Sequence, residues 1–224
     1  MKIEIIPCLN DNYSYLIYDE NSNTVAMIDP SEFFACDKII NQNYKKLDFI
    51  FNTHHHYDHV GGNKDLKIKY NSIVVGFEED KNRIPGIDKV LKDKQVFKIG
   101  DLSFTTIFIP GHTSGHIAFY SEKEKVIFTG DTLFSLGCGR VFEGTYKQMF
   151  NSLNKLKNLP KDTRVYCGHE YTYKNLEFCM KFNPNNIFLK SKKDAIELNL
   201  KNKKPTIPST IGDEIKTNIF VRFN

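Results

Sequence analysis

Short apolar runs of strand length dominate the first three quarters of the chain. Ten such runs are rich in valine, isoleucine and aromatic residues, and glycine, asparagine and aspartate occupy the connections between them. This pattern predicts strands at residues 3–9, 13–19, 24–30, 49–54, 72–77, 95–99, 102–109, 116–121, 125–130 and 164–168. We therefore predict a large β-rich domain that extends to about residue 170.

Two segments inside this region have helical patterns. Residues 37–44 are compatible with a helix packed against a strand. Residues 146–156 have the clearer helical spacing, with apolar side chains at Tyr146, Met149, Phe150, Leu153 and Leu156. Thr145 and Gln148 have the T-x-x-Q spacing of a capping box, so we predict that this helix starts there and ends before Pro160.

The last quarter of the chain changes character. Residues 175–182 and 192–200 have helical patterns, and Ser191 precedes the second of them with Asp194 three residues later. No repeat with a period typical of solenoids is present. We therefore expect two parts, a β-rich domain at residues 1–170 and a short, helical, basic domain at residues 171–224.

Composition is typical of a globular protein kept in the cytosol. The 224 residues are 40% hydrophobic and 26% charged, and no apolar run approaches the ~18 residues that cross a bilayer. The start, MKIEIIPCLNDNY, lacks the long apolar stretch of a signal peptide. Five cysteines are scattered without a C-x-x-C pair, which indicates reduced thiols. We expect a cytoplasmic protein without a membrane partner.

The formal charge of +4 is unevenly distributed. From Lys174 onward there are ten lysines and arginines against five aspartates and glutamates. A basic tail of this kind suits an anionic small molecule or a nucleic acid, or it faces only water. Because lysine and asparagine are abundant throughout the chain, biased base composition of the genome explains the tail equally well.

The sequence THHHYDHVGG, residues 53–62, holds four of the seven histidines. Side chains alternate at the end of a strand, so His54 and His56 are expected on one side and His55 on the other. Asp58 and His59 follow after the chain has turned. We predict that His54 and His56 bind one metal ion, that Asp58 and His59 reach a second, and that His55 supports them without being a ligand.

Three further candidates each come directly after a predicted strand: His112 in PGHT, Asp131 in TGDT and His169 in CGHE. Alone, each would more commonly be a structural histidine or a turn aspartate. Together with H-x-H-x-D-H they form a set of seven imidazole and carboxylate ligands, which suits zinc and also iron or manganese. Seven ligands on two metals require a shared group, for which Asp131 is the best candidate. His116 is expected to have a supporting role.

Two metals about 3.5–4 Å apart can hold a bridging water and lower its pKa towards neutrality, which generates a hydroxide nucleophile. A metal-bound carbonyl oxygen is polarised at the same time. The chain has no G-x-S-x-G motif for a serine hydrolase. These features predict a metal-dependent hydrolase of an ester, thioester, lactam or phosphodiester.

The motifs THHHYDH, PGHT, TGDT and CGHE resemble those of the metallo-β-lactamase superfamily. This resemblance implies an αββα sandwich, a mixed α/β (α+β) fold, here with a small C-terminal helical domain. Two longer stretches, FTGDTLFSLGCGRVFEGT at residues 128–145 and CGHEYTYKN at residues 167–175, resemble the glyoxalase II family more narrowly. The resemblance covers nearly the whole chain.

Glyoxalase II enzymes hydrolyse S-D-lactoylglutathione to D-lactate and glutathione, the second step of methylglyoxal detoxification. The resemblance implies that the first metal is held by His54, His56 and His112, the second by Asp58, His59 and His169, and both by Asp131. Asp58 and Asp131 would then act in catalysis together with the metal-bound hydroxide. A thiolate with a pKa near ~8.5 leaves readily, so thioester hydrolysis needs little help from a general acid.

The resemblance also implies contacts to the substrate. Arg140 and Tyr171 match positions that contact glutathione in the family, and Phe142 stands where some members have a tyrosine. Many members continue to a basic motif that holds a glutathione carboxylate. We expect Lys216, Lys204 or other lysines of the basic tail to face the anionic substrate instead. The enzyme is expected to act as a monomer on a small molecule, in the β-rich part of residues 1–170, with residues 171–224 binding substrate.

Four alternatives differ in testable ways. A persulfide dioxygenase uses one iron on the same fold, but VFEGT favours a thioesterase. A thioesterase for a different low-molecular-weight thiol fits the same metal ligands. A tRNA-processing nuclease needs a long RNA-binding arm, for which the chain has no segment, so no nucleic-acid partner is expected. A non-catalytic scaffold usually loses ligands, and here all seven are in place.

Overall fold

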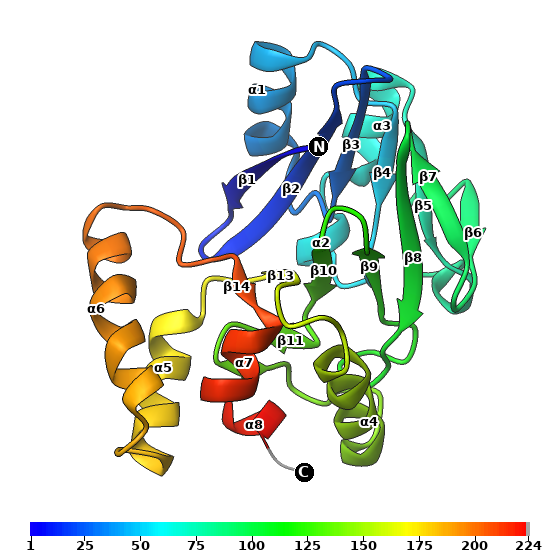
Figure 1. Cartoon of the computed structure of the whole chain (residues 1–224). Helices are drawn as coiled ribbons and strands as arrows, with labels where there is room; N and C mark the ends of the chain where they lie inside the picture. Colours follow the sequence, from blue (N-terminus) through cyan, green and yellow to red (C-terminus); the bar gives the residue numbers. More distant parts are fainter. Residues whose placement is uncertain (223–224) are drawn as a thin grey trace.

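Two six-stranded sheets form the centre of the molecule (Figure 1). The computed structural model describes residues 1–222. The first sheet contains, in spatial order, β1 (Lys2–Cys8), β2 (Asn12–Asp19), β3 (Thr24–Ile28), β4 (Phe49–Phe51), β5 (Ile73–Phe77) and β6 (Lys89–Leu91). The first three strands pair antiparallel, and β3 to β6 pair parallel. The parallel part therefore places several strand ends at one edge.

The second sheet has the spatial order β14, β13, β10, β9, β8, β7. In chain order its strands are β7 (Val96–Ile99), β8 (Leu102–Phe108), β9 (Ile117–Ser121), β10 (Val126–Gly130), β13 (Arg164–Cys167) and β14 (Ser209–Thr210). Only β10 and β13 pair parallel within it. A small hairpin of β11 (Leu133–Phe134) and β12 (Gly137–Cys138) follows β10.

Side chains alternate between the two faces of each sheet, and this alternation explains how the sheets and helices are layered. Ile17, Phe51 and Phe128 belong to the apolar cluster between the two sheets. Their chain neighbours face the other way: Leu16 and Ile50 pack under α1 (Phe33–Asn43) and α3 (Asn63–Tyr70), and Ile127 packs under α4 (Tyr146–Lys157). Each sheet therefore buries both faces, one against the other sheet and one against helices. The predicted αββα sandwich is confirmed.

The final part of the chain is helical apart from β14. Its helices are α5 (Thr172–Phe182), α6 (Ile187–Lys201), α7 (Ile211–Thr217) and α8 (Ile219–Arg222). A separate small apolar cluster, which includes Leu176, Cys179 and Leu189, joins α5 to α6. Within residues 1–222, none of the helices combines the length and the apolar character that crossing a membrane would require.

All ten predicted strands are present, and the capping box of Thr145 and Gln148 starts α4 as expected. The helix predicted at 192–200 was placed too late, because Asn186 caps α6 and Ser191 lies inside it. The patterns did not predict the short strands β6, β11, β12 and β14, or the helices α2 (Tyr57–Val60), α3, α7 and α8. Helix α3 buries a single apolar side chain, Leu66, so its sequence carries almost no helical periodicity.

Candidate metal centre

The seven predicted ligands converge from five places in the chain. His54 and His56 lie in the loop after β4, and Asp58 and His59 lie in helix α2, which follows at once. The other three follow strands of the second sheet: His112 comes between β8 and β9, Asp131 directly after β10, and His169 two residues after β13. The site therefore lies where strands of both sheets end, and each sheet supplies part of it.

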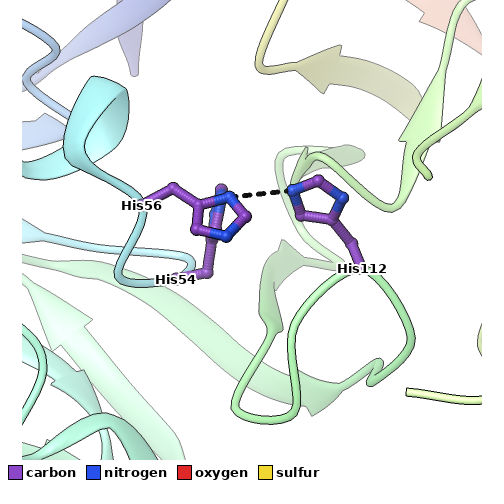
Figure 2. Close-up of side chains that lie close together, drawn as sticks. All are labelled: His54, His56 and His112. Carbon is purple, nitrogen blue, oxygen red and sulfur yellow. Dashed lines mark hydrogen bonds between the residues drawn. The ribbon is translucent and has the colours of Figure 1, made fainter. Parts of the chain in front are cut away.

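His54, His56 and His112 form one group (Figure 2). His112 Nε2 lies 3.0 Å from His56 Nδ1, and one ring nitrogen from each of the three histidines lies within 4.8 Å of the others. Burial lowers the pKa of all three imidazoles, and for His54 the neighbouring His59 and His116 add to the effect. These rings are therefore neutral at physiological pH, the form that binds a metal ion.

Asp58, His59 and His169 form a second group. Asp58 Oδ2 lies 3.4 Å from His169 Nε2 and 3.7 Å from His59 Nε2. Burial opposes protonation of His169, but Asp131 and Asp58 outweigh it and raise its pKa to about 10. Burial likewise opposes protonation of His59, and Asp131 raises its pKa well above the ordinary value. The carboxylates beside these two rings therefore favour positive charge at this point.

Asp131 contacts both groups. Its Oδ1 lies 3.3 Å from His59 Nε2, and its Oδ2 lies 3.2 Å from His169 Nε2 and 3.5 Å from His112 Nε2. Burial disfavours the charged form of this carboxyl, but His59 and His169 hold its pKa well below the usual range. It is the one predicted ligand whose oxygens face nitrogens of both groups.

Several buried atoms in the described part of the chain point into this space without a hydrogen-bond partner: His54 Nε2, His59 Nε2 and Asp131 Oδ1. An unpartnered buried polar atom is costly, and although His59 Nε2 and Asp131 Oδ1 face each other at 3.3 Å, none of the three atoms makes a hydrogen bond within residues 1–222. Imidazole nitrogens and a carboxylate are the donors that divalent transition metals accept. The residues present therefore fit a divalent metal ion.

Most of these side chains are held from outside the cluster. Nδ1 of His169 lies 2.8 Å from Asp11 Oδ1, Nδ1 of His59 lies 3.1 Å from Asp29 Oδ2, and Asn12 Nδ2 donates to Asp58 at 2.9 Å. Carboxylate partners of this kind fix the orientation of an imidazole and make the other nitrogen a better ligand. Gly168 is required beside them, since a Cβ there would lie 2.2 Å from Asp131 Oδ1.

The two remaining histidines, His55 and His116, belong to neither group. His116 is fully buried, its Nε2 accepts the backbone N–H of Asp131 at 3.0 Å, and its ring stacks on His54 with centroids 4.6 Å apart. The ring nitrogens of His55 instead lie 3.4 Å from Asp80 and 3.4 Å from Glu143. The strand β4 ends at Phe51, yet the alternation assumed for residues 54–56 still describes how these side chains lie.

A cavity of about 590 Å³ opens onto the two groups. Arg140, Phe142 and Tyr171, the substrate contacts implied by the resemblance, line this cavity, and Lys216 does not. Lys216 instead lines a separate cavity beside Phe188, with its Nζ 5.2 Å from the centre of that ring. Its predicted role in substrate binding gains no geometric support.

Among the lining residues that were not singled out from the sequence are Phe134, Lys174 and Asn175. Lys174 and Asn175 come three and four residues after Tyr171, so helix α5 presents them on the same side as the tyrosine. That spacing was the signal that could have identified them. Lys174 has no ion-pair partner within residues 1–222, and neither does Arg140.

Comparison with known proteins gives consistent matches along the chain. The model of the metallo-β-lactamase superfamily matches residues 10–169, and the model of the hydroxyacylglutathione hydrolase C-terminus matches residues 170–224. The chain is 52% identical to a hydroxyacylglutathione hydrolase of Pelagibacter ubique (strain HTCC1062), covering 99% of this chain and 93% of that protein. It is 46% identical to the hydroxyacylglutathione hydrolase of Brucella ovis, covering 100% and 87%. Among solved structures, BLEG-1 B3 metallo-β-lactamase has a TM-score of 0.76 at 22% identity, over 99% of this chain and 100% of that one.

Proposed function

Because the chain belongs to the hydroxyacylglutathione hydrolase family of the metallo-β-lactamase superfamily, we propose that it hydrolyses the thioester bond of 2-hydroxyacyl-glutathiones, S-D-lactoylglutathione first among them. The observation that carries the proposal is the position of Asp131, whose two oxygens face nitrogens of both histidine groups in one cavity. The products are a 2-hydroxy acid, D-lactate for the lactoyl thioester, and free glutathione.

The metal complement we propose is two divalent ions, with zinc preferred and iron or manganese as alternatives. His54, His56 and His112 would hold the first, Asp58, His59 and His169 the second, and Asp131 both. Such ions act as Lewis acids that polarise a carbonyl oxygen and supply a water of lowered pKa as the nucleophile. All seven ligands come from one chain, which supports a monomer as the active unit.

Protein groups would position the substrate for this attack. Phe134 and Phe142 give the cavity apolar walls beside the metal ligands, and the ring of Phe142 lies 5.2 Å from that of His112. Tyr171 stacks on His169 with ring centroids 4.7 Å apart, and burial with nearby aspartates raises its pKa to about 12. Its hydroxyl therefore stays protonated at neutral pH and can donate a hydrogen bond to the substrate.

The reaction balances without a protein general acid. A C–O bond forms between the attacking water oxygen and the acyl carbon, the C–S bond breaks, and the thiolate leaves. Thiols ionise near pH 8.5, so the departing sulfur needs no proton in the transition state. A carboxylate, a thiolate and the protons of the water are the products, and Asp58 lines the cavity in which this water would attack.

Recognition of the glutathione half of the substrate would fall to two cations that form no ion pair within residues 1–222. Arg140 and Lys174 line the same cavity from the loop after β12 and from α5, and glutathione carries two carboxylates. We propose that these two side chains, rather than Lys216, meet those carboxylates. Residues 1–170 would then supply the reacting groups, and residues 171–224 would supply part of the thiol site.

A steady-state assay combined with metal analysis tests the proposal. Purified protein should contain close to two metal ions per chain and should hydrolyse S-D-lactoylglutathione faster than the lactoyl thioester of the uncharged thiol N-acetylcysteamine. Failure to hydrolyse any thioester, or fewer than one metal per chain after growth in metal-replete medium, would refute it. Oxygen consumption on glutathione persulfide by an iron-loaded form would instead point to a persulfide dioxygenase.

A further inference from the structure

His56 differs from the other predicted ligands in what holds it. His54, His59, His112 and His169 each contact a group outside the metal cluster through the ring nitrogen Nδ1. Within residues 1–222 the only polar contact of the His56 ring is with His112 Nε2, which is itself a predicted ligand. Something other than a hydrogen bond to a group outside the cluster must therefore orient His56.

Its chain neighbour His55 lies against two carboxylates and a guanidinium. His55 Nδ1 lies 3.4 Å from Asp80 Oδ2, and His55 Nε2 lies 3.4 Å from Glu143 Oε1 and 3.5 Å from Arg83 Nη1. The Asp80 side chain is fully buried, and the His55 side chain is 17% exposed. Since His55 and His56 share a peptide bond, fixing the one ring restricts the backbone that carries the other.

Arg83 is the centre of this arrangement. Its Nη1 contacts both carboxylate oxygens of Glu143 at 2.8 Å, its Nε donates to Asp80 at 2.9 Å, and its Nη2 contacts Asp80 and donates to Ser114 Oγ at 2.9 Å. The planar guanidinium has five N–H donors in a fixed geometry, and here they reach three acceptor groups on three different segments. We call the set of His55, Asp80, Arg83 and Glu143 the Arg83 network.

The network also reaches the turn that carries His112. Glu143 Oε2 accepts the backbone N–H of Ser114 at 2.8 Å, and the backbone N–H groups of Phe142 and Glu143 donate to the His112 carbonyl at 3.3 Å. Asp80 presses against the same turn, since a Cβ at Gly115 would lie 2.2 Å from its Oδ1. The loop from the first sheet and the turn from the second are thus attached to one guanidinium.

We propose that the Arg83 network is the positioning device for the first metal group: it sets the spacing of His56 and His112, and Arg83 is a positioning residue for the proposed thioesterase. The inference rests on the proposed metal assignment. The network supports only the first metal group. The second group is held by the carboxylates of Asp11 and Asp29 and makes no contact with the Arg83 network in the described structure. Arg83→Ala should therefore weaken one metal site and spare the other.

Stability alone would not reveal such a role. Arg83 and Glu143 are each about 30% exposed, and ion pairs at that exposure contribute little to the free energy of unfolding. The exposed pair of Lys67 and Asp88, 2.5 Å apart with similar exposure, joins helix α3 to the segment before β6 far from the metal ligands. Lys67→Ala is therefore a matched control that removes an ion pair without touching the network.

The experiment follows zinc release from zinc-loaded protein into a chromogenic chelator in stopped flow. Wild-type protein should release two equivalents in two phases, and the phase lost or altered in His112→Ala identifies the first group. In Arg83→Ala that phase should accelerate about tenfold to a hundredfold, the range seen when groups supporting a metal ligand are removed. The other phase should stay within twofold. The kcat should fall while KM for S-D-lactoylglutathione stays within twofold, and Lys67→Ala should resemble wild type throughout.

Conservative variants add a readout that a general packing defect would not give. Arg83→Lys keeps the charge but cannot reach three acceptors, so it should release zinc almost as fast as Arg83→Ala. If Arg83→Ala does not fold, judged by circular dichroism, Glu143→Gln replaces it and should accelerate the same phase by a smaller factor.

Equal acceleration of both phases, wild-type release rates, or a raised KM with unchanged kcat would each overturn the inference. A wild-type protein that binds no zinc and hydrolyses no thioester would instead count against the proposed function itself. The two failures are therefore distinguishable.

Discussion

Replacing Asp131 gives the most direct test of the two-group site. The 6% exposed carboxylate faces His59 and His169 within 3.3 Å and His112 at 3.5 Å, so Asp131→Ala removes a donor from both groups at once. A Lewis acid contributes several kcal/mol to stabilising the transition state. Taking about 4 kcal/mol as that contribution, and 1.36 kcal/mol for each factor of ten, kcat/KM should fall about a thousandfold. Metal content should fall below one ion per chain.

Loss of folding must be separated from loss of metal. Removing one member of a buried ion pair costs about 3–5 kcal/mol, so Asp131→Ala also risks the fold. Asp131→Asn keeps the shape of the side chain, and Asp19→Ala removes a similarly buried carboxylate, 2% exposed, that accepts backbone N–H groups at the far end of the first sheet. Asp19→Ala should lower stability in urea yet retain metal and activity in the folded fraction.

His55→Ala completes the comparison, because His55 lies in the same histidine run but contacts Asp80 and Glu143. Its kcat/KM should fall by no more than about a hundredfold, as for a residue that supports a ligand. The assays are hydrolysis of S-D-lactoylglutathione, metal content by elemental analysis, and near-UV circular dichroism. Equal losses in Asp131→Ala and His55→Ala would show that the ligand assignment is mistaken.

Three other changes have definite expected outcomes. Lys174→Glu should raise KM for S-D-lactoylglutathione about tenfold or more with little change in kcat, and should leave the N-acetylcysteamine thioester unaffected; Lys190→Glu is the control, since α6 keeps it out of the cavity. Thr145→Ala should cost about 1 kcal/mol of unfolding free energy, because Thr145 Oγ1 accepts the Gln148 N–H at the start of α4; an unchanged urea midpoint would contradict the assigned cap. Burial raises the pKa of Glu214 above its unfolded value, so this carboxyl favours the fold at low pH and its contribution is lost as pH rises through the interval between the unfolded and folded pKa values. Glu214→Gln should therefore gain stability relative to wild type as pH rises from 4 to 8, measured by urea unfolding, and a difference independent of pH would refute this account.

The strands were predictable because each has both a β-rich composition and flanking turn residues. Phe51 and Phe128 occupy the inner layer while their neighbours Ile50 and Ile127 face helices, so these strands appear as continuous apolar runs. The short elements β11 and β12 are two residues each, below the length at which a pattern exists. Helix α3 was not predicted for a related reason: it has almost no apolar periodicity, since Ile68 is 82% exposed and Leu66 is the one apolar residue that it buries.

The candidate ligands were predictable for a different reason, namely that their local motifs are specific even though the contacts between them are long-range. His169 and Asp11 are 158 residues apart and meet at 2.8 Å, a pairing that no local pattern indicates. The same applies to Arg83, which lies in an unremarkable loop and joins Asp80 to Glu143. The prediction for Lys216 failed because it rested on the net charge of the tail. Net charge indicated a cation near the substrate but carries no information about which lysine faces the cavity.

Both groups draw ligands from the two sheets. His54 and His56 from the first sheet meet His112 from the second, and Asp58 and His59 meet His169 in the same way. During synthesis the amino-terminal part of each group leaves the ribosome long before its partner, because His169 follows His59 by 110 residues. Each half supplies only part of either ligand group, so we expect tight metal binding only after the two sheets have packed together. The free energy of metal binding would then add mainly to the stability of the folded protein, and little to that of earlier intermediates.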